Sequence, residues 1–225
     1  LLAWRAGRTP DRPAFRVFAA DTAELSWGRV LSAVDEIAAG LLGLGVQLEQ
    51  TVAIMSTARL DGLLMDLAVA RAGAASLAVH PSSRAADLAF VLRDSAACVM
   101  VAEDSAEVAE VGELWPGLPD LQVVVVLDSS AMGPGSAYAG DRRVISLDDV
   151  RARGQTLLAR DRAAVQRRSA VVTGSHLASL AYTAGTTGRP KGIVIDHERM
   201  LLRSTFDAER LDGPLLNPLP LSFLA

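Results

Sequence analysis

The segment at residues 121–127, LQVVVVL, constrains the fold of this chain more than any other. Its run of four valines shows no alternation of polar and apolar side chains, so both faces of the segment are expected to be buried. A strand of this kind lies inside a parallel sheet that helices cover on both faces. The segment therefore predicts an α/β fold.

Shorter apolar segments repeat this signal along the chain and alternate with amphipathic segments. Helices are predicted where apolar residues recur at intervals of three and four, and strands where short apolar runs are bounded by turn residues. The predicted helices cover residues 26–42, 60–72, 84–94, 105–114 and 157–168, and the predicted strands cover residues 51–55, 76–79, 98–101, 121–127, 143–147, 177–183 and 192–195. This order predicts an α/β architecture of doubly wound, mostly parallel sheets with flanking helices.

The composition is typical of a globular protein, with 50% hydrophobic and 21% charged residues. A formal net charge of −4 provides no basic surface, which argues against nucleic-acid binding. The single cysteine, Cys98, lies in an apolar segment and is expected to be a buried core residue in a reducing compartment. No uncharged apolar stretch reaches the roughly 20 residues of a membrane span. The protein is therefore expected to be cytoplasmic, without a transmembrane segment, and a peripheral membrane contact stays open.

A different signal lies at residues 183–192, TAGTTGRPKG. Gly185 and Gly188 allow backbone N–H groups to turn toward an anion, the threonines offer hydroxyl groups, and Lys191 adds an ammonium group. Pro190 stands where the nucleotide loop G-x-x-x-x-G-K-[ST] requires glycine, so the segment is not that loop. A plain turn between two strands is the alternative, but the composition of the segment favours phosphate binding.

Residues 182–192, YTAGTTGRPKG, followed by His197, resemble the signature of adenylate-forming enzymes. This superfamily contains acyl-CoA synthetases, luciferase-like enzymes and the adenylation domains of peptide synthetases. The resemblance continues upstream through TPDRPAFR, ARAGAASLAVHPSSRAADLAFVLRDSAA and LPDLQVVVVLD, which together extend over most of the chain. In these segments the sequence is most similar to bacterial long-chain fatty acyl-CoA synthetases.

The resemblance implies that residues 1–225 form part of the large N-terminal AMP-binding domain of such an enzyme. Residues 1–170 would form a first α/β subdomain, and residues 171–225 would begin a second one that carries the phosphate-binding loop at residues 182–192. The C-terminal domain of the family, with its catalytic lysine, would be absent, as would a downstream glutamate. No catalytic residue is therefore assigned, and this portion alone is expected to be inactive.

The resemblance also implies ATP, Mg²⁺ and CoA as cofactors. A carboxylic acid, here a long-chain fatty acid, would be activated to an acyl-adenylate and then transferred to the thiol of CoA or of an acyl carrier protein. No metal ligand is assigned in this chain. The residues expected to bind the phosphates of ATP are Thr183, Ala184, Gly185, Thr186, Thr187, Gly188 and Lys191.

Several positions near the loop qualify this reading. Tyr182 is expected to pack beneath the loop without touching ligand, and Arg189 is expected to face solvent. Ala184 stands where the family usually has serine, and Phe223 stands where a histidine is usual. Two alternatives therefore stay open: a ligase that transfers the acyl group to a carrier protein, and a degenerate homologue that binds without catalysis.

Overall fold

A computed structural model describes residues 1–17, 23–128, 140–183 and 189–202. Its helices are α1 (Leu2–Arg8), α2 (Trp27–Gly43), α3 (Leu60–Arg71), α4 (Ala85–Asp94), α5 (Ser105–Leu114), the 3-10 helix η1 (Trp115–Gly117), α6 (Leu147–Arg160) and α7 (Ala164–Ala170). Its strands are β1 (Pro13–Val17), β2 (Ala23–Ser26), β3 (Thr51–Met55), β4 (Ala75–Val79), β5 (Val99–Ala102), β6 (Val123–Val126), β7 (Val144–Ser146), β8 (Leu177–Thr183) and β9 (Lys191–Asp196).

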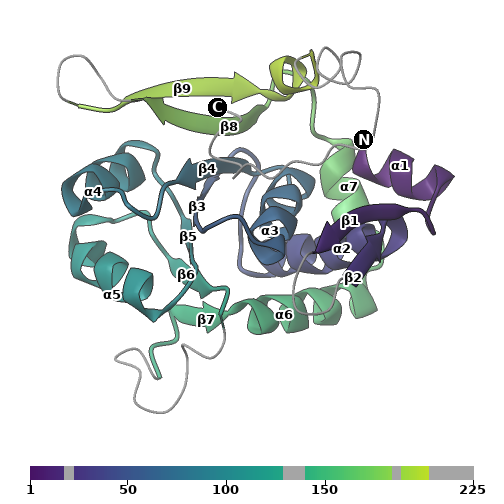
Figure 1. Ribbon diagram of the computed structural model, residues 1–225, viewed down its shortest axis with the longest axis horizontal. Helices are drawn as coiled ribbons and strands as arrows, with labels where there is room; N and C mark the ends of the chain where they lie inside the picture. Colours follow the sequence, from purple (N-terminus) through teal and green to yellow (C-terminus); the bar gives the residue numbers. More distant parts are fainter. Residues whose placement is uncertain (18–22, 129–139, 184–188, 203–225) are drawn as a thin grey trace.

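Seven of these strands form one sheet in the order β7-β6-β5-β3-β4-β8-β9 (Figure 1). All neighbours in it are parallel except β8 and β9, which pair as an antiparallel hairpin at one edge. β1 and β2 form a separate antiparallel pair beside α2. The predicted doubly wound, mostly parallel α/β architecture is confirmed.

The two faces of the large sheet form two separate cores, because successive strand residues point to opposite faces. In β3, Val52 and Ile54 join the core under α2, α3 and α6. Ala53 and Met55 join the core under α4 and α5 on the other face.

Cys98 has only 3% of its surface exposed, and burial raises the pKa of its thiol. The expectation of a buried core cysteine is confirmed.

The close approach of α2 and α6 depends on two glycines. A Cβ atom on Gly40 of α2 would overlap the carbonyl oxygen of Val150 in α6. A Cβ atom on Gly154 of α6 would overlap the carbonyl oxygen of Glu36 in α2. Both glycines are buried, and in both cases the obstructing atom belongs to the backbone. The spacing of these two helices is therefore set by the absence of side chains at the two positions.

The prediction of one helix at residues 157–168 is wrong, because two helices with a turn between them occupy this region. α6 begins ten residues earlier, where Ser146 and Asp149 form a reciprocal capping box. It ends where Asp161 turns away and its carboxylate accepts a hydrogen bond from the backbone N–H of Ala163, 3.2 Å away. The polar and arginine-rich first half of α6 hides its helical periodicity in the sequence.

None of the helices among the described residues has the length and apolar character needed to cross a membrane.

The carboxyl ends of β3 and β5 are joined by a carboxylate, Glu103. Its oxygens accept hydrogen bonds from the backbone N–H of Thr57 at 2.6 Å and from the hydroxyl groups of Thr57 and Ser56 at 2.7 and 3.2 Å. Arg59 lies 3.5 Å from the same carboxylate. Burial alone would raise the pKa of Glu103, but these hydrogen bonds and the arginine outweigh burial and lower it. Glu103 is therefore held as a charged cross-link between two central strands.

Glu107, in the first turn of α5, has the opposite electrostatic setting. Its carboxylate accepts the backbone N–H of Glu103 at 2.5 Å and faces the negative charges of Asp104, Glu103 and Glu110. Burial, with those charges in support, raises the pKa of Glu107 to about 7. A group with a raised carboxyl pKa favours the folded state while it is protonated and disfavours it once it is ionised.

Glu107→Gln is expected to make the protein less sensitive to alkaline pH. The folded-state pKa of about 7 lies above the ordinary value of 4.5, so the wild type loses stability as the pH rises through about 7. Glutamine stays neutral and still accepts the Glu103 N–H. The free energy of unfolding, measured in urea, should favour the variant more at pH 8.5 than at pH 5. Glu113→Gln, an exposed change on the same helix, is the control; parallel pH profiles for wild type and Glu107→Gln would refute the expectation.

Gly154→Ala is expected to destabilise the fold, because the added methyl group meets the backbone of α2 and the helices must separate. Overpacking of this kind costs about 1–3 kcal/mol or more. The matched control is Gly43→Ala at the end of α2, where the nearest atom would lie at 3.9 Å, an ordinary contact. Urea denaturation followed by circular dichroism should show a lower midpoint for Gly154→Ala only. Equal midpoints for the two variants would contradict the close-packing account.

Candidate functional site

The signature segment lies on the β8–β9 hairpin at the edge of the sheet (Figure 1). β8 covers residues 177–183, as predicted, and β9 extends the predicted strand by one residue at each end. In the antiparallel register Tyr182 is opposite Gly192, and Thr183 is opposite Lys191. The predicted site residues Ala184, Gly185, Thr186, Thr187 and Gly188 lie outside the described residues, and the described site consists of the two strand ends on either side of them.

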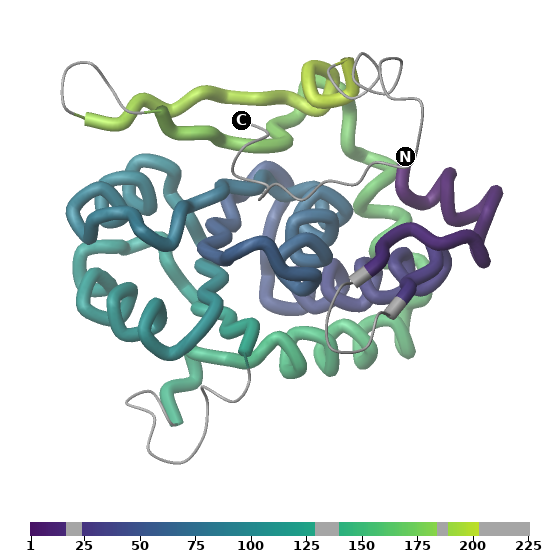
Figure 2. Tube along the Cα trace, in the orientation of Figure 1, coloured from purple at the N-terminus to yellow at the C-terminus, as the bar shows by residue number. Residues whose placement is uncertain are grey.

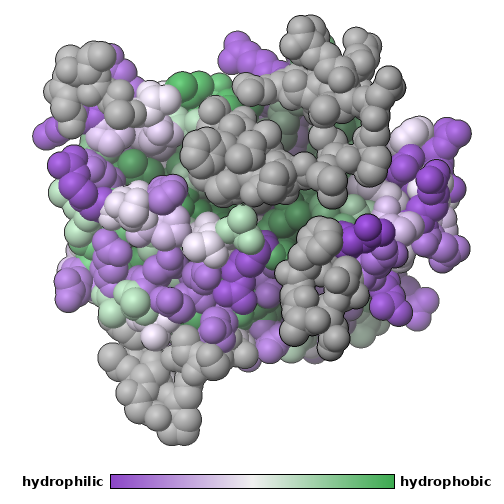
Figure 3. Space-filling model, viewed as in Figure 1, coloured by the Kyte–Doolittle hydropathy of each residue, from purple (hydrophilic) through white to green (hydrophobic). Residues whose placement is uncertain are grey.

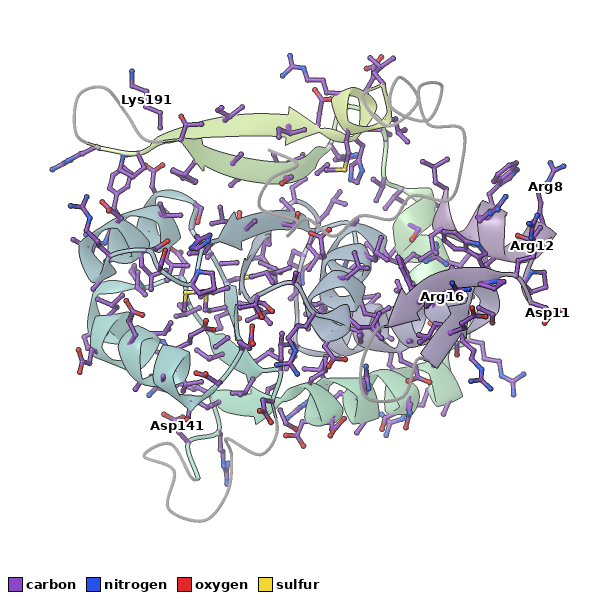
Figure 4. All side chains as sticks on the ribbon, viewed as in Figure 1. Arg8, Asp11, Arg12, Arg16, Asp141 and Lys191 are labelled. Atoms are coloured by element: carbon purple, nitrogen blue, oxygen red, sulfur yellow. The ribbon has the colours of Figure 1, made fainter. Side chains whose placement is uncertain are left out.

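The side chains of Thr183 and Lys191 are both exposed where the two strands end. Neither has a hydrogen-bond or ion-pair partner among the residues described. Figure 4 shows Lys191 extending away from the body of the protein at the end of the hairpin. A hydroxyl donor and an ammonium group are thus available side by side to an anion, which is the chemistry expected for phosphate binding.

Tyr182 faces the other way and packs against α4. Its hydroxyl group donates a hydrogen bond to the Asp94 carboxylate at 2.6 Å, and its ring meets the Phe90 ring edge to face with centroids 6.5 Å apart. Burial and, after it, the hydrogen bond to Asp94 raise the pKa of Tyr182, so the phenol stays protonated. Tyr182 is thus a packing residue that rests on α4, and the loop beneath which it was expected to pack lies outside the described residues. Asp94 and Phe90 carried no signal that linked them to the loop, since Asp94 lies 88 positions earlier in the chain.

Arg189 follows the undescribed part of the loop and is exposed, as expected from sequence. Its guanidinium carbon nevertheless lies 5.9 Å from the centroid of the Phe90 ring, within the range of a cation–π contact. The segments before and after the loop therefore both contact α4.

The far end of the hairpin is held by polar contacts of Asp196 and His197, where β9 passes into a helix. Asp196 accepts the backbone N–H of Arg199 at 2.7 Å, which caps the helical residues 197–202. His197 donates its backbone N–H to the carbonyl of His176 at 3.1 Å. Burial and then the nearby His176 lower the pKa of His197, so its ring favours the neutral form. This histidine fixes the base of the hairpin and lies at the opposite end from Lys191.

A second place to look for a site is the point where the strand order reverses, between β3 and β5, because doubly wound folds bind ligands there. In this chain the Glu103 carboxylate occupies that position and is bonded to Ser56 and Thr57. The described residues contain no group of three or more histidine, cysteine or acidic side chains that could hold a metal ion. Among the described residues, the hairpin end is therefore the better candidate site.

Comparison with known proteins identifies the family of the chain. The AMP-binding enzyme family matches residues 2–225. Long-chain-fatty-acid–CoA ligase FadD15 of Mycobacterium bovis is 32% identical over 164 residues, which are 73% of this chain and 25% of the ligase. Phosphinothricin tripeptide synthetase PhsB of Streptomyces viridochromogenes is 30% identical over 200 residues, which are 88% of this chain and 14% of the synthetase. The chain thus spans a quarter or less of the length of these two relatives.

The fold is shared with solved structures of related enzymes. The crystal structure of the anthranilate–CoA ligase AuaEII in complex with anthranoyl-AMP aligns with 91% of this chain and 35% of its own length, with a TM-score of 0.68 and 20% identity. At that identity the likeness concerns the fold alone. The family match extends over nearly the whole sequence and includes both strands of the hairpin. This chain therefore belongs to the AMP-binding enzyme family, the adenylate-forming enzymes whose signature its glycine- and threonine-rich loop resembles.

Proposed function

We propose that the complete gene product activates a long-chain fatty acid with ATP and transfers the acyl group to the thiol of CoA. In the first step a carboxylate oxygen attacks the α-phosphorus of ATP, the bond from that phosphorus to pyrophosphate breaks, and an acyl-adenylate forms. In the second step the thiol sulfur attacks the acyl carbon, the thiol proton is lost, and AMP leaves. Membership of the AMP-binding family and the similarity to a long-chain-fatty-acid–CoA ligase support the proposal.

One observation carries the role of the hairpin: Thr183 and Lys191 are register partners, and both are exposed at the strand ends. Phosphoryl transfer depends mainly on positioning and on neutralising charge. In this proposal Lys191 neutralises charge on the β- and γ-phosphates, and the Thr183 hydroxyl donates to a phosphate oxygen. The predicted residues that would complete the cradle are Ala184, Gly185, Thr186, Thr187 and Gly188.

The accompanying metal ion and the domain division are part of the same proposal. Mg²⁺, when bound, would offset the negative charge of the phosphates. The described residues provide no carboxylate cluster for it, so its protein ligands would come from elsewhere.

The division into two subdomains between residues 170 and 171 is likewise proposed. The strand that follows this division, β8, pairs with β4 in the same sheet as the first part of the chain.

A carrier-protein thiol is the second candidate acceptor. The similarity to a tripeptide synthetase favours it, because that relative is a peptide synthetase by name. A panel of carboxylic acids offered with either CoA or a phosphopantetheinylated carrier protein separates the two acceptors.

Ala184, in place of the usual serine, motivates the third candidate, a homologue that binds nucleotide without catalysis. Carboxylate-dependent ATP–pyrophosphate exchange by the complete gene product would exclude that candidate.

Lys191→Ala is expected to weaken ATP binding and pyrophosphate exchange. Loss of a charged hydrogen-bond donor costs about 1.5–3 kcal/mol, which corresponds to a roughly ten- to hundredfold loss. Exchange kinetics and ATP affinity on the complete gene product provide the measurement. Arg199→Ala is the control, since this arginine is 70% exposed and pairs with Asp196 at the far end of the hairpin. Unchanged exchange in Lys191→Ala would remove the hairpin end from the proposed site.

A further inference from the structure

We propose that Asp94 and Phe90 of α4 are positioning residues that hold both sides of the phosphate-binding loop in place. This inference rests on the proposed function for its catalytic consequence, but its structural part stands on contacts of the described residues. Neither residue belongs to the signature, and neither touches the strand-end side chains that would meet ATP. They act through Tyr182 and Arg189.

The first side of the loop is fixed through Tyr182, the last residue but one of β8. Its phenol donates to the Asp94 carboxylate at 2.6 Å, a distance typical of a hydrogen bond to a charged acceptor. Its ring packs edge to face on Phe90, and both rings lie against the core under α4 and α5. The position of Thr183, which follows directly, is thereby tied to a helix on a different part of the fold.

The second side is fixed by contacts that converge on the same two aromatic rings. The Arg189 guanidinium lies over Phe90 at 5.9 Å. Gly192 lies opposite Tyr182, and a Cβ atom on it would sit only 3.2 Å from Cζ of the ring. The ring therefore covers the backbone of β9 directly beside Lys191. Any side chain at position 192 would push the ring away from Asp94 or push β9 away from β8.

These contacts matter because β9 has little other support at this end. β9 is an edge strand, and Ile193 and Val194, which point to opposite faces of it, are 47% and 59% exposed. Figure 3 shows hydrophobic surface along this strand at the top of the view. In Figure 2 the two strands of the hairpin run above the coils of α4. β8 pairs with β4 at Ser179 and Leu180, before the end of the strand. Two strands alone are marginally stable, so beyond Leu180 the contacts with α4 position the end of the hairpin.

The functional consequence is that the anchoring on α4 fixes the positions of the Thr183 hydroxyl and the Lys191 ammonium group. A displacement of about 1 Å at a binding group can cost a hundredfold in rate. If α4 fixes the loop, then Asp94→Ala, which removes the acceptor, and Tyr182→Phe, which removes the donor, should lower pyrophosphate exchange although neither side chain contacts substrate. Because they remove the same hydrogen bond, the double variant should lose no more than the stronger single variant.

The experiment compares wild type, Asp94→Ala, Tyr182→Phe, their double variant and the control Asp87→Ala. Asp87 lies two turns earlier on the same helix, where its carboxylate pairs with Arg84. Two measurements are made on the complete gene product: ATP–pyrophosphate exchange, with kcat and KM for ATP, and amide hydrogen exchange of the strand ends at residues 180–183 and 191–194.

We expect roughly three- to thirtyfold losses in kcat/KM for ATP and faster amide exchange in both strand ends for the three test variants, with Asp87→Ala like wild type. Wild-type amide exchange in Asp94→Ala and Tyr182→Phe would overturn the inference, as would additive losses in the double variant. A wild type without carboxylate-dependent pyrophosphate exchange would instead overturn the proposed function. In that case amide exchange alone still decides whether α4 anchors the hairpin.

Discussion

Burial of the parallel sheet on both faces is the constraint on which the rest of this structure depends. Strands β3, β5 and β6 present successive side chains to two cores, so helices must cover both faces and no strand of this group can be polar on one side. The helices on one face approach so closely that Gly40 and Gly154 leave no room for a side chain. The helices on the other face include α4, which lies next to the strand pair that carries the signature.

The same arrangement separates the parts that stabilise the fold from the parts that are available to a ligand. At the reversal point of the strand order, Glu103 accepts hydrogen bonds from Ser56 and Thr57 and binds the two central strands together. Those groups are satisfied within the protein. At the sheet edge, by contrast, the side chains of Thr183 and Lys191 are exposed and have no hydrogen-bond or ion-pair partner among the described residues. The edge hairpin is therefore the better binding place for an anion, because the donor groups at the reversal point already have partners within the protein.

The hairpin shows how a binding loop can be exposed and still be positioned. Its end must reach solvent to meet a phosphate group, and an exposed edge hairpin has few contacts to fix it. Here the Tyr182 side chain points inward and contacts α4, in which Asp94 lies 88 residues earlier in the sequence. The neighbouring Thr183 side chain is exposed. The alternation of side chains along a strand thus lets one residue anchor while the next one binds.

The sequence by itself determined the α/β class, most helices and strands, the buried cysteine and the family, because hydrophobic periodicity and the glycine- and threonine-rich segment are local signals. It missed the true extent of α6, because the polar first half and Gly154 hide the apolar periodicity of this helix. The packing of α6 against α2, which Gly154 permits, is seen only in the structure. It identified Lys191 and Thr183 among the candidate phosphate-binding residues but gave no sign of Asp94. Only the tertiary structure brings Asp94 to Tyr182 and Glu103 to Thr57, because contacts between distant segments depend on strand order and helix placement, which no local pattern encodes.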